Sequence, residues 1–186
     1  MLLRKVSFII IMLFAMSVAK AQMLAVNTDV AMDGLMAPNL GLELTVGNQS
    51  TLSLNGLISH KPWGKTAQVA ALQPEYRYYL SGRPMDRFFL GLGGIAAVYD
   101  VNIKDKRYDG YCAGAGLTFG YVLPLTERLS VDFHAGFGVT RYKQKEYYLG
   151  DDFDNEYSLD GNQRSNASGF RYMPTRIGVS LSYTLR

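Results

Sequence analysis

The side chains of this 186-residue chain that could do chemistry are a few ionisable residues set in largely apolar segments. Asp132 and His134 stand two positions apart, so on a β-strand they project from the same face. A carboxylate beside an imidazole is a pairing that general acid–base catalysis uses. The sequence places no serine or cysteine nucleophile beside the pair, and we expect both residues to lie deep in the fold. We therefore predict no catalytic residues and a protein that is not an enzyme.

Three further charged residues, Glu43, Glu75 and Arg77, fall on faces that we expect to point the same way. Counted from the nearest short turn, they lie at the same level as Asp132 and His134. A charge inside a narrow fold loses its hydration and needs a partner. We predict one ionic network of these residues, which fills the interior and holds the strands in register. A proton or ion relay along the same residues is the alternative.

A second group of candidate ligands lies in residues 143–168, which we expect to form a long loop. Asp151, Asp152, Asp154 and Glu156 supply hard oxygen atoms of the kind that calcium prefers. Their spacing differs from that of the EF-hand loop. We expect a solvated acidic loop, with calcium binding as the alternative, and we predict no cofactor.

Aromatic residues alternate with charges in the same loop. They are Tyr147, Tyr148, Phe153 and Tyr157, and Trp63 lies in an earlier expected loop at residues 60–66. Such a composition suits contact with another protein or a glycan. We predict that these aromatic residues form a partner surface. The basic residues are scattered and the formal net charge is only +3, which argues against nucleic acid as a partner.

The elements that must position these residues are β-strands. From Ile177 to Leu185 every second residue is apolar, and the residues between them are glycine, serine or threonine. This period of two predicts a strand with two chemically different faces. Segments with the same alternation begin near Leu24, Leu40, Leu52, Ala67, Phe88, Tyr111 and Leu129. We therefore predict about eight strands, the first of them continuing through Ala31.

The connections between these strands alternate in length. The short ones are residues 47–50, 81–84 and 124–128, and the long ones are residues 60–66, 104–109 and 143–168. Short periplasmic turns and long external loops are typical of outer-membrane β-barrels. An eight-stranded barrel has an interior that side chains fill, so we expect a plugged lumen. Pro74 cannot donate to a strand ladder, and we expect a β-bulge there.

The N-terminal 21 residues have the pattern of a secretory signal peptide. Arg4 and Lys5 precede an apolar run, and Ala19-Lys20-Ala21 forms a small-x-small cleavage site. A transmembrane helix is the alternative, but the run is too short to cross a bilayer comfortably. We predict a signal peptide over residues 1–21 and one β-barrel over residues 22–186. The single cysteine, Cys112, rules out an intramolecular disulfide.

Residues 73–80, 114–121 and 178–185 resemble a family of small uncharacterised outer-membrane proteins that carry a domain of unknown function and occur in Gram-negative gut and oral bacteria. The overall architecture is also similar to small OmpA- and OmpX-type barrels. The resemblance implies an outer-membrane location and supplies no catalytic residues. The genetic setting of some family members resembles that of accessories of surface fimbriae.

Together these patterns predict an all-β protein, an antiparallel up-and-down transmembrane barrel in the outer membrane of a Gram-negative bacterium, with both termini periplasmic. We expect a monomer, inserted into outer-membrane lipid by the barrel-insertion machinery. Its external loops would serve surface interaction, envelope integrity or fimbria-related assembly. The alternative is a soluble periplasmic barrel of lipocalin type that binds a small apolar ligand. The two differ in which face of the barrel is apolar.

Overall fold

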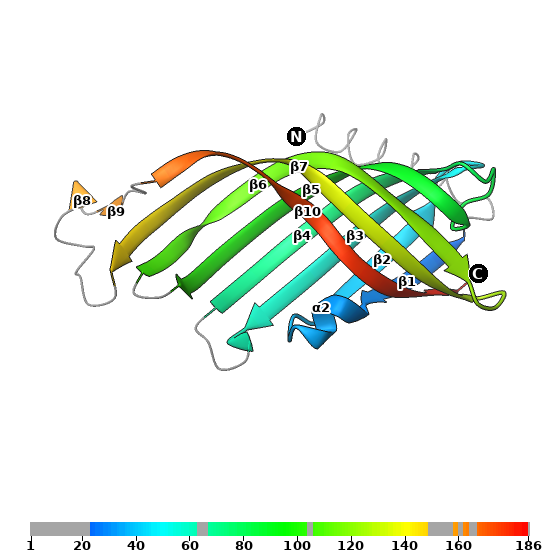
Figure 1. Ribbon diagram of the computed structural model, residues 1–186, viewed down its shortest axis with the longest axis horizontal. Helices are drawn as coiled ribbons and strands as arrows, with labels where there is room; N and C mark the ends of the chain where they lie inside the picture. The colour runs from blue at the N-terminus through cyan, green and yellow to red at the C-terminus, as the bar shows by residue number, and fades with distance from the viewer. Residues whose placement is uncertain are drawn as a thin grey trace, which may run out of the picture.

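Eight antiparallel strands close into a barrel in the computed structural model, which describes residues 23–62, 67–103, 106–148, 158–159, 162–163 and 167–185 (Figure 1). The barrel strands are β1 (Leu24–Asp29), β2 (Asn39–Thr45), β3 (Ser50–His60), β4 (Ala67–Tyr79), β5 (Arg87–Ile103), β6 (Lys106–Pro124), β7 (Leu129–Tyr148) and β10 (Ala167–Thr184). Each pairs with its neighbours in the sequence, and β1 pairs with β10 to close the ring. The prediction of eight antiparallel strands is confirmed. Two short strands, β8 (Ser158–Leu159) and β9 (Asn162–Gln163), pair only with each other.

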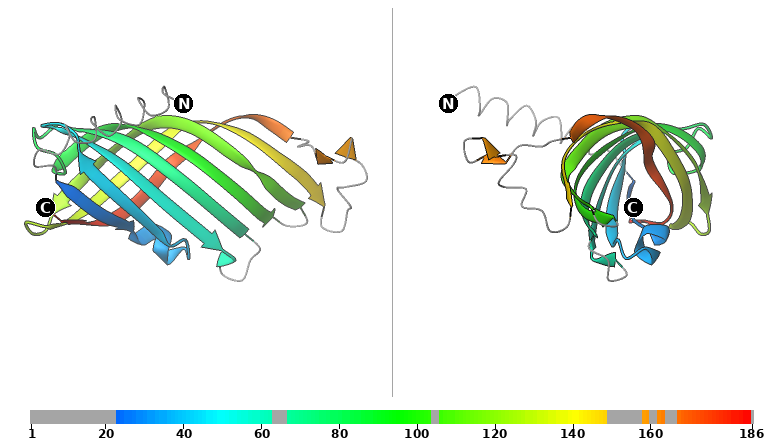
Figure 2. Two further views of the ribbon diagram at one scale, coloured as in Figure 1. Left: turned by 180° about the vertical axis from the view of Figure 1, so that it is seen from behind. Right: turned by 60° about the vertical axis from the view of Figure 1, so that its left-hand side comes forward.

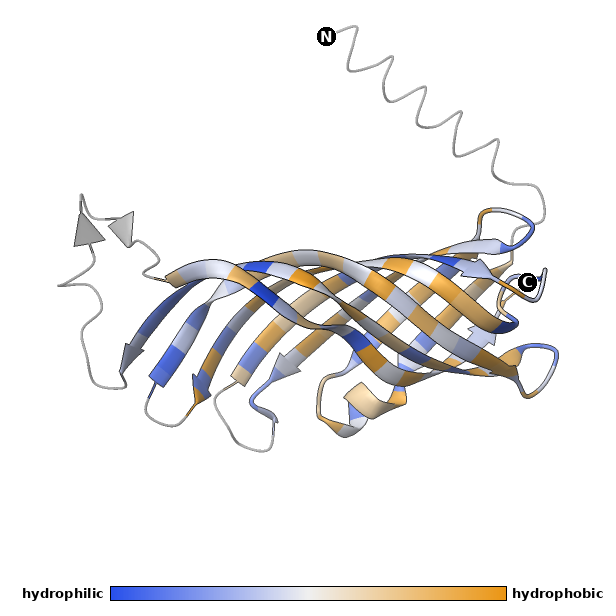
Figure 3. Cartoon of the chain, turned by 45° about the horizontal axis from the view of Figure 1, so that its top comes forward, coloured by the Kyte–Doolittle hydropathy of each residue, from blue (hydrophilic) through white to orange (hydrophobic). Residues whose placement is uncertain are grey.

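The alternation of residues sorts side chains between the two faces of the barrel wall. Large apolar residues lie on the outer face, where Leu92 is 64% exposed and Leu117 is 68% exposed. Polar residues such as Asn27 and Ser53 are buried inside. Among the described residues, three of the buried apolar side chains, Tyr79, Phe89 and Val122, form one small cluster. Figure 3 shows the outcome, with apolar residues distributed over the middle of the barrel and hydrophilic residues gathered at the far ends of the long strands.

The barrel wall is much taller on one side than on the other. β1 has 6 residues and β2 has 7, whereas β6 has 19 and β7 has 20. Figure 2 shows the strands winding around one axis, with the long strands extending past the short ones. β1 meets β10 only from Ser180 to Thr184. Within the described chain, the part of β10 before Ser180 therefore has a strand partner on the β7 side alone.

A short helix, α2 (Val30–Gly34), follows β1 and contacts β10. Asp29 ends the strand and caps this helix, because its carboxylate accepts hydrogen bonds from the backbone N–H groups of Ala31 and Met32, at 3.0 and 3.2 Å. The same Oδ1 atom accepts from the backbone N–H of Val179 at 3.3 Å. One side chain thus starts the helix and satisfies a backbone donor of β10. The prediction that the first strand continues through Ala31 is wrong for this reason.

The barrel contains a β-bulge, but not at Pro74. The register between β4 and β5 is the same on both sides of that residue, and the proline ring lies on the outer face beside Gly94. The register between β10 and β7 shifts instead between Pro174 and Arg176. The bulge adds Thr175 to β10, so that Thr175 and Arg176 are both buried inside the barrel.

Two predicted loops are shorter than expected. The strands β5 and β6 reach Ile103 and Lys106, which leaves only residues 104–105 between them instead of 104–109. The long loop predicted at 143–168 is replaced by strand as far as Tyr148 and again from Ala167. The outward positions of these strand ends are polar, as at Asp100 and Arg107, so the ladder continues where the outward row of apolar residues has stopped.

The predicted signal peptide at residues 1–21 lies outside the described residues. No helix in the part of the chain that the structure describes is long and apolar enough to cross a membrane.

Candidate functional site

The centre of the lumen is the guanidinium group of Arg77, which contacts three carboxylates. Its Nη1 atom lies 2.7 Å from Asp132 Oδ2 and 3.3 Å from Glu43 Oε2, and its Nε atom donates to Glu75 Oε2 at 2.8 Å. The side chain of Arg77 is 1% exposed. The carboxylates come from three different strands, β2, β4 and β7. Arg77 therefore links opposite walls of the barrel through charge-assisted hydrogen bonds.

Aromatic and hydroxyl groups complete the surroundings of this cluster. The guanidinium carbon of Arg77 lies 4.4 Å from the centre of the Phe89 ring, a cation–π contact. Glu43 Oε1 accepts hydrogen bonds from the hydroxyls of Tyr79 and Thr51, at 2.7 and 2.6 Å. The period-two geometry of β4 explains the arrangement, since it turns Glu75, Arg77 and Tyr79 to the same side.

Arg176 brings a second guanidinium to the cluster from β10. Its Nη1 atom donates to Glu75 Oε2 at 2.6 Å. The bulge places Thr175 next to Arg176 on the same side, and the backbone carbonyl of Thr175 accepts a hydrogen bond from Gln73 Nε2 at 2.9 Å. Glu75 is therefore held between Arg77 and Arg176, and β4 is tied to β10 across the lumen.

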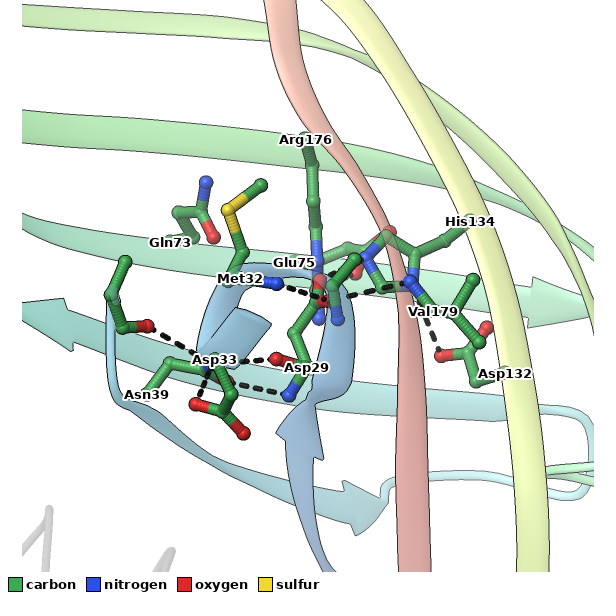
Figure 4. A network of polar contacts seen from close by, with 12 residues as sticks. Asp29, Met32, Asp33, Asn39, Gln73, Glu75, Asp132, His134, Arg176 and Val179 are labelled. Atoms are coloured by element: carbon green, nitrogen blue, oxygen red, sulfur yellow. Dashed lines mark hydrogen bonds and ion pairs between the residues drawn. The ribbon is translucent and has the colours of Figure 1, made fainter. Parts of the chain in front are cut away.

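His134 joins the network to the first strand (Figure 4). Its Nε2 atom lies 3.3 Å from Asp29 Oδ2 and its Nδ1 atom 3.7 Å from Asp132 Oδ2. The imidazole is completely buried. Asp132 thus stands between Arg77 and His134. The complete network joins β1, β2, β4, β7 and β10, and its carboxylates outnumber its guanidinium groups.

The structure brings together every residue of the predicted lumen network, which comprises Glu43, Glu75, Arg77, Asp132 and His134. It also adds residues that the sequence analysis left out, namely Asp29, Tyr79, Phe89 and Arg176. All four have the inward position in the alternation of their strands. A count of every inward residue at this level would have found them.

His134 is among the residues that line a hollow of about 570 Å³ together with exposed outer-face residues such as Leu90 and Phe119, but its imidazole is completely buried. Ser180 lies opposite Asp132 in the β10–β7 register, so the fold does place a serine near the pair of Asp132 and His134. However, Asp132, His134 and Ser180 are all buried. The cavity beside Asp29 and Arg176 has a volume of about 20 Å³, enough for about one water molecule. Chemically, the arrangement can cross-link strands and exclude solutes.

The predicted partner surface is only partly described. Tyr147 and Tyr148 are the last residues of β7 rather than loop residues. The Arg107 guanidinium lies 5.9 Å from the Tyr147 ring centre, and the Lys106 ammonium lies 4.8 Å from that of Tyr148. The other members of the predicted surface, Trp63, Phe153 and Tyr157, lie outside the described residues.

The candidate calcium ligands Asp151, Asp152, Asp154 and Glu156 also lie outside the described residues. Over the ranges that the structure covers, no group of three or more histidine, cysteine, aspartate or glutamate residues could hold a metal ion. Cys112 is a free, half-buried thiol.

Comparison with known proteins places the chain in a family. A family model described as a protein of unknown function (DUF3575) matches residues 7–185. No curated protein and no solved structure matches the chain. The match covers nearly the whole sequence, and the chain belongs to the DUF3575 family.

Proposed function

We propose that this protein is a non-enzymatic β-barrel of the outer membrane of a Gram-negative bacterium, with lipid around its outer face. The observation that carries the proposal is the inverted distribution of side chains. Large apolar residues such as Leu92, Leu117 and Ile58 are more than half exposed, while charged residues such as Arg77 and Glu75 are buried. Soluble proteins rarely expose so large a contiguous apolar surface. An outward apolar band is the defining surface of a transmembrane barrel.

The same distribution argues against a soluble lipocalin-type barrel. A barrel of that class holds its ligand in an interior cavity. Here the lumen contains the ionic network, and the cavity next to Arg176 has a volume of about 20 Å³. A small apolar ligand would have to displace paired charges. We therefore favour a plugged barrel that conducts no solute.

The role that we assign to the barrel is presentation of its long-loop end. The network ties five strands together, which makes the part of the barrel around Arg77 a rigid base. β5, β6, β7 and β10 continue as a sheet toward the long-loop end, past the ends of the shorter strands. We propose that this sheet and the connecting loops contact an extracellular protein or glycan, in surface interaction, envelope integrity or fimbria-related assembly. A monomer is sufficient for this role, because the long-loop end of a single barrel is exposed.

The proposed topology follows from the short turns. Ala25 and Thr184 are opposite each other in the register, so both described ends of the chain lie together. The tight connections before Ser50 and Leu129 are at that end too. We propose that this end is periplasmic, that residues 1–21 are a signal peptide removed on export, and that the barrel-insertion machinery places the mature chain in the membrane.

The first test is cell fractionation of the full chain, with outer-membrane samples run on a gel before and after boiling. We expect the protein in the outer membrane, with a mobility that changes on heating because the barrel resists detergent. A soluble periplasmic protein without a heat shift would contradict the proposal.

A sharper test uses two identical substitutions. Leu117 lies in the middle of the outer face, between Leu92 and Phe137 in the register, whereas Leu125 is 53% exposed in a short turn. We expect Leu117→Arg to lower the free energy of unfolding in lipid vesicles by about 2–4 kcal/mol, because arginine at mid-bilayer is costly. Leu125→Arg should change it little. Equal, small effects of the two variants in urea unfolding would rule out lipid contact at Leu117.

A further inference from the structure

We propose that the outer face of β3–β7 carries a binding site for a phosphate-bearing lipid, with one acyl chain in an apolar groove and the phosphate at Lys143. The site rests on the proposed membrane location, because lipid reaches the outer face only there. It goes further in naming one place on the barrel and one lipid chemistry.

The apolar part of the site is a groove of about 930 Å³ on the outer face. Small residues make the hollow: Gly56 lies on β3, and Ala96 of β5 is directly opposite Ala113 of β6. Four residues closer to the short turns on the same two strands, the opposed pair is Leu92 and Leu117. The apolar band is thus interrupted by a depression where a chain of methylene groups can lie.

A second groove of about 660 Å³ continues from the first toward the long-loop end. The two share the side chains of Ile58, Ala70, Val98 and Tyr111 as lining, so they form one track. Beyond these residues the lining becomes polar, with His60, Gln68 and Lys143. The track therefore has an apolar portion and a polar end, as an amphiphile does.

With Arg107 of the neighbouring strand counted, three cations at the polar end face two carboxylates, Asp100 and Asp109. Asp100 accepts hydrogen bonds from Arg107 of the neighbouring strand, and Asp109 lies opposite Lys145 in the register. Lys143 lies opposite Tyr111 and makes no ion pair with any other described residue. The ammonium of Lys143 is thus left for a ligand, and it stands beside the apolar groove.

This pattern matches the chemistry of a phosphate-bearing lipid. Lysine binds phosphate as a point charge, and basic residues near a membrane surface attract anionic lipid. Each methylene group buried in the groove adds to the affinity. The polar end lies toward the long loops, where lipid headgroups would be in the proposed orientation.

The experiment uses the full chain, purified in detergent, with native mass spectrometry to count bound lipid. The probes are dioleoyl phosphatidic acid and dioleoylglycerol, which have the same chains and differ in the phosphate. We expect one phosphatidic acid to bind in preference to dioleoylglycerol. Equal retention of the two probes would overturn phosphate recognition.

Two variants with matched controls separate the parts of the site. Lys143→Gln should weaken phosphatidic acid binding about fivefold, since one cation near a membrane surface contributes about 1 kcal/mol. Arg128→Gln, in a short turn at the opposite end, should leave binding unchanged. The double substitution Ala96→Leu and Ala113→Leu fills the groove and should weaken both probes by about tenfold or more, whereas Ala115→Leu, outside the groove on β6, should not.

The outcomes distinguish this site from the proposed function. Loss of binding in the Lys143 and groove variants alone, with an unchanged heat shift on gels, supports the site. Equal binding by Lys143→Gln and Arg128→Gln, or by the groove variant and Ala115→Leu, would overturn it while the membrane barrel stands. A wild-type protein that shows no heat shift and stays out of the membrane fraction would instead contradict the membrane barrel.

Discussion

Two arginine–carboxylate assemblies occupy opposite environments in this barrel. Arg77 contacts three carboxylates in the lumen, with a side chain that is 1% exposed. Arg107 binds Asp100 on the outer face near the far strand ends, where its side chain is 38% exposed. Its Nε atom donates to Asp100 Oδ1 at 2.8 Å, close to the distances within the lumen. The hydrogen bonds are alike, and the access of water differs.

The difference determines what each assembly does for the protein. A buried ionic group whose partner is removed remains without water or a counter-charge, which is costly. Water solvates an exposed charge whether or not its partner is present, so an exposed ion pair stabilises the folded state little. We therefore expect the lumen network to govern the stability of the barrel, and the Arg107–Asp100 pair to hold the strand ends in register at small energetic consequence.

The largest effect should come from Arg77→Met. The substitution keeps much of the side-chain length but leaves Glu43, Glu75 and Asp132 without their shared cation. We expect the free energy of unfolding to fall by about 3–5 kcal/mol, measured by urea unfolding in lipid vesicles. Arg83→Met, at an exposed turn residue, is the control and should have little effect. Similar stabilities of the two variants would show that the network does not hold the barrel together.

An intermediate effect is expected for Arg77→Lys. Lysine retains the charge but lacks the planar fork that contacts several carboxylates together. We expect a loss of about 1–3 kcal/mol, between the methionine variant and the wild type, because part of the desolvation of the carboxylates stays uncompensated. Unfolding curves for both variants under the same conditions provide the measurement. A lysine variant as unstable as the methionine variant would mean that charge alone contributes nothing here.

The smallest effect should follow from Arg107→Gln. We expect a change of about 0–1 kcal/mol in the free energy of unfolding, because water replaces the lost partner of Asp100. Raising the salt concentration should reduce even this difference, whereas the effect of Arg77→Met should persist, since salt screens exposed charges much more than buried ones. Unfolding at low and high salt tests both statements. A salt-independent loss of several kcal/mol at Arg107 would contradict the contrast.

Much of the fold could be predicted because the barrel wall imposes a period of two. The inward positions of Glu43, Arg77 and Asp132 followed from that alternation alone. The same logic failed at the strand ends near Asp100 and Arg107, because the outward positions there are polar and no longer carry the large apolar residues that mark the strands nearer the short turns. The alternation arises because the outward positions are apolar and the inward positions are polar. Where the outward positions become polar, this pattern ends, even though the backbone hydrogen bonds between the strands continue.

Two local features lay beyond the reach of the alternation. The bulge that adds Thr175 to β10 depends on how that strand meets its neighbours, and Pro74 shows that a proline alone does not specify a bulge. The helix after β1 depends on Asp29, whose carboxylate serves two backbone groups at once. Aspartate is a preferred capping residue, but the next residues, Val30 and Ala31, continue the strand pattern, which predicted strand here.

The unequal height of the barrel has a consequence for the surrounding bilayer in the proposed setting. At about 3.3 Å per residue, the six residues of β1 extend about 20 Å, whereas the apolar band of such barrels is about 25 Å tall. This hydrophobic mismatch is confined to the β1–β2 side, and lipids accommodate such a shortfall by local thinning. The barrel would therefore thin the membrane in one direction only, and that direction is set by where β1 stops and α2 begins.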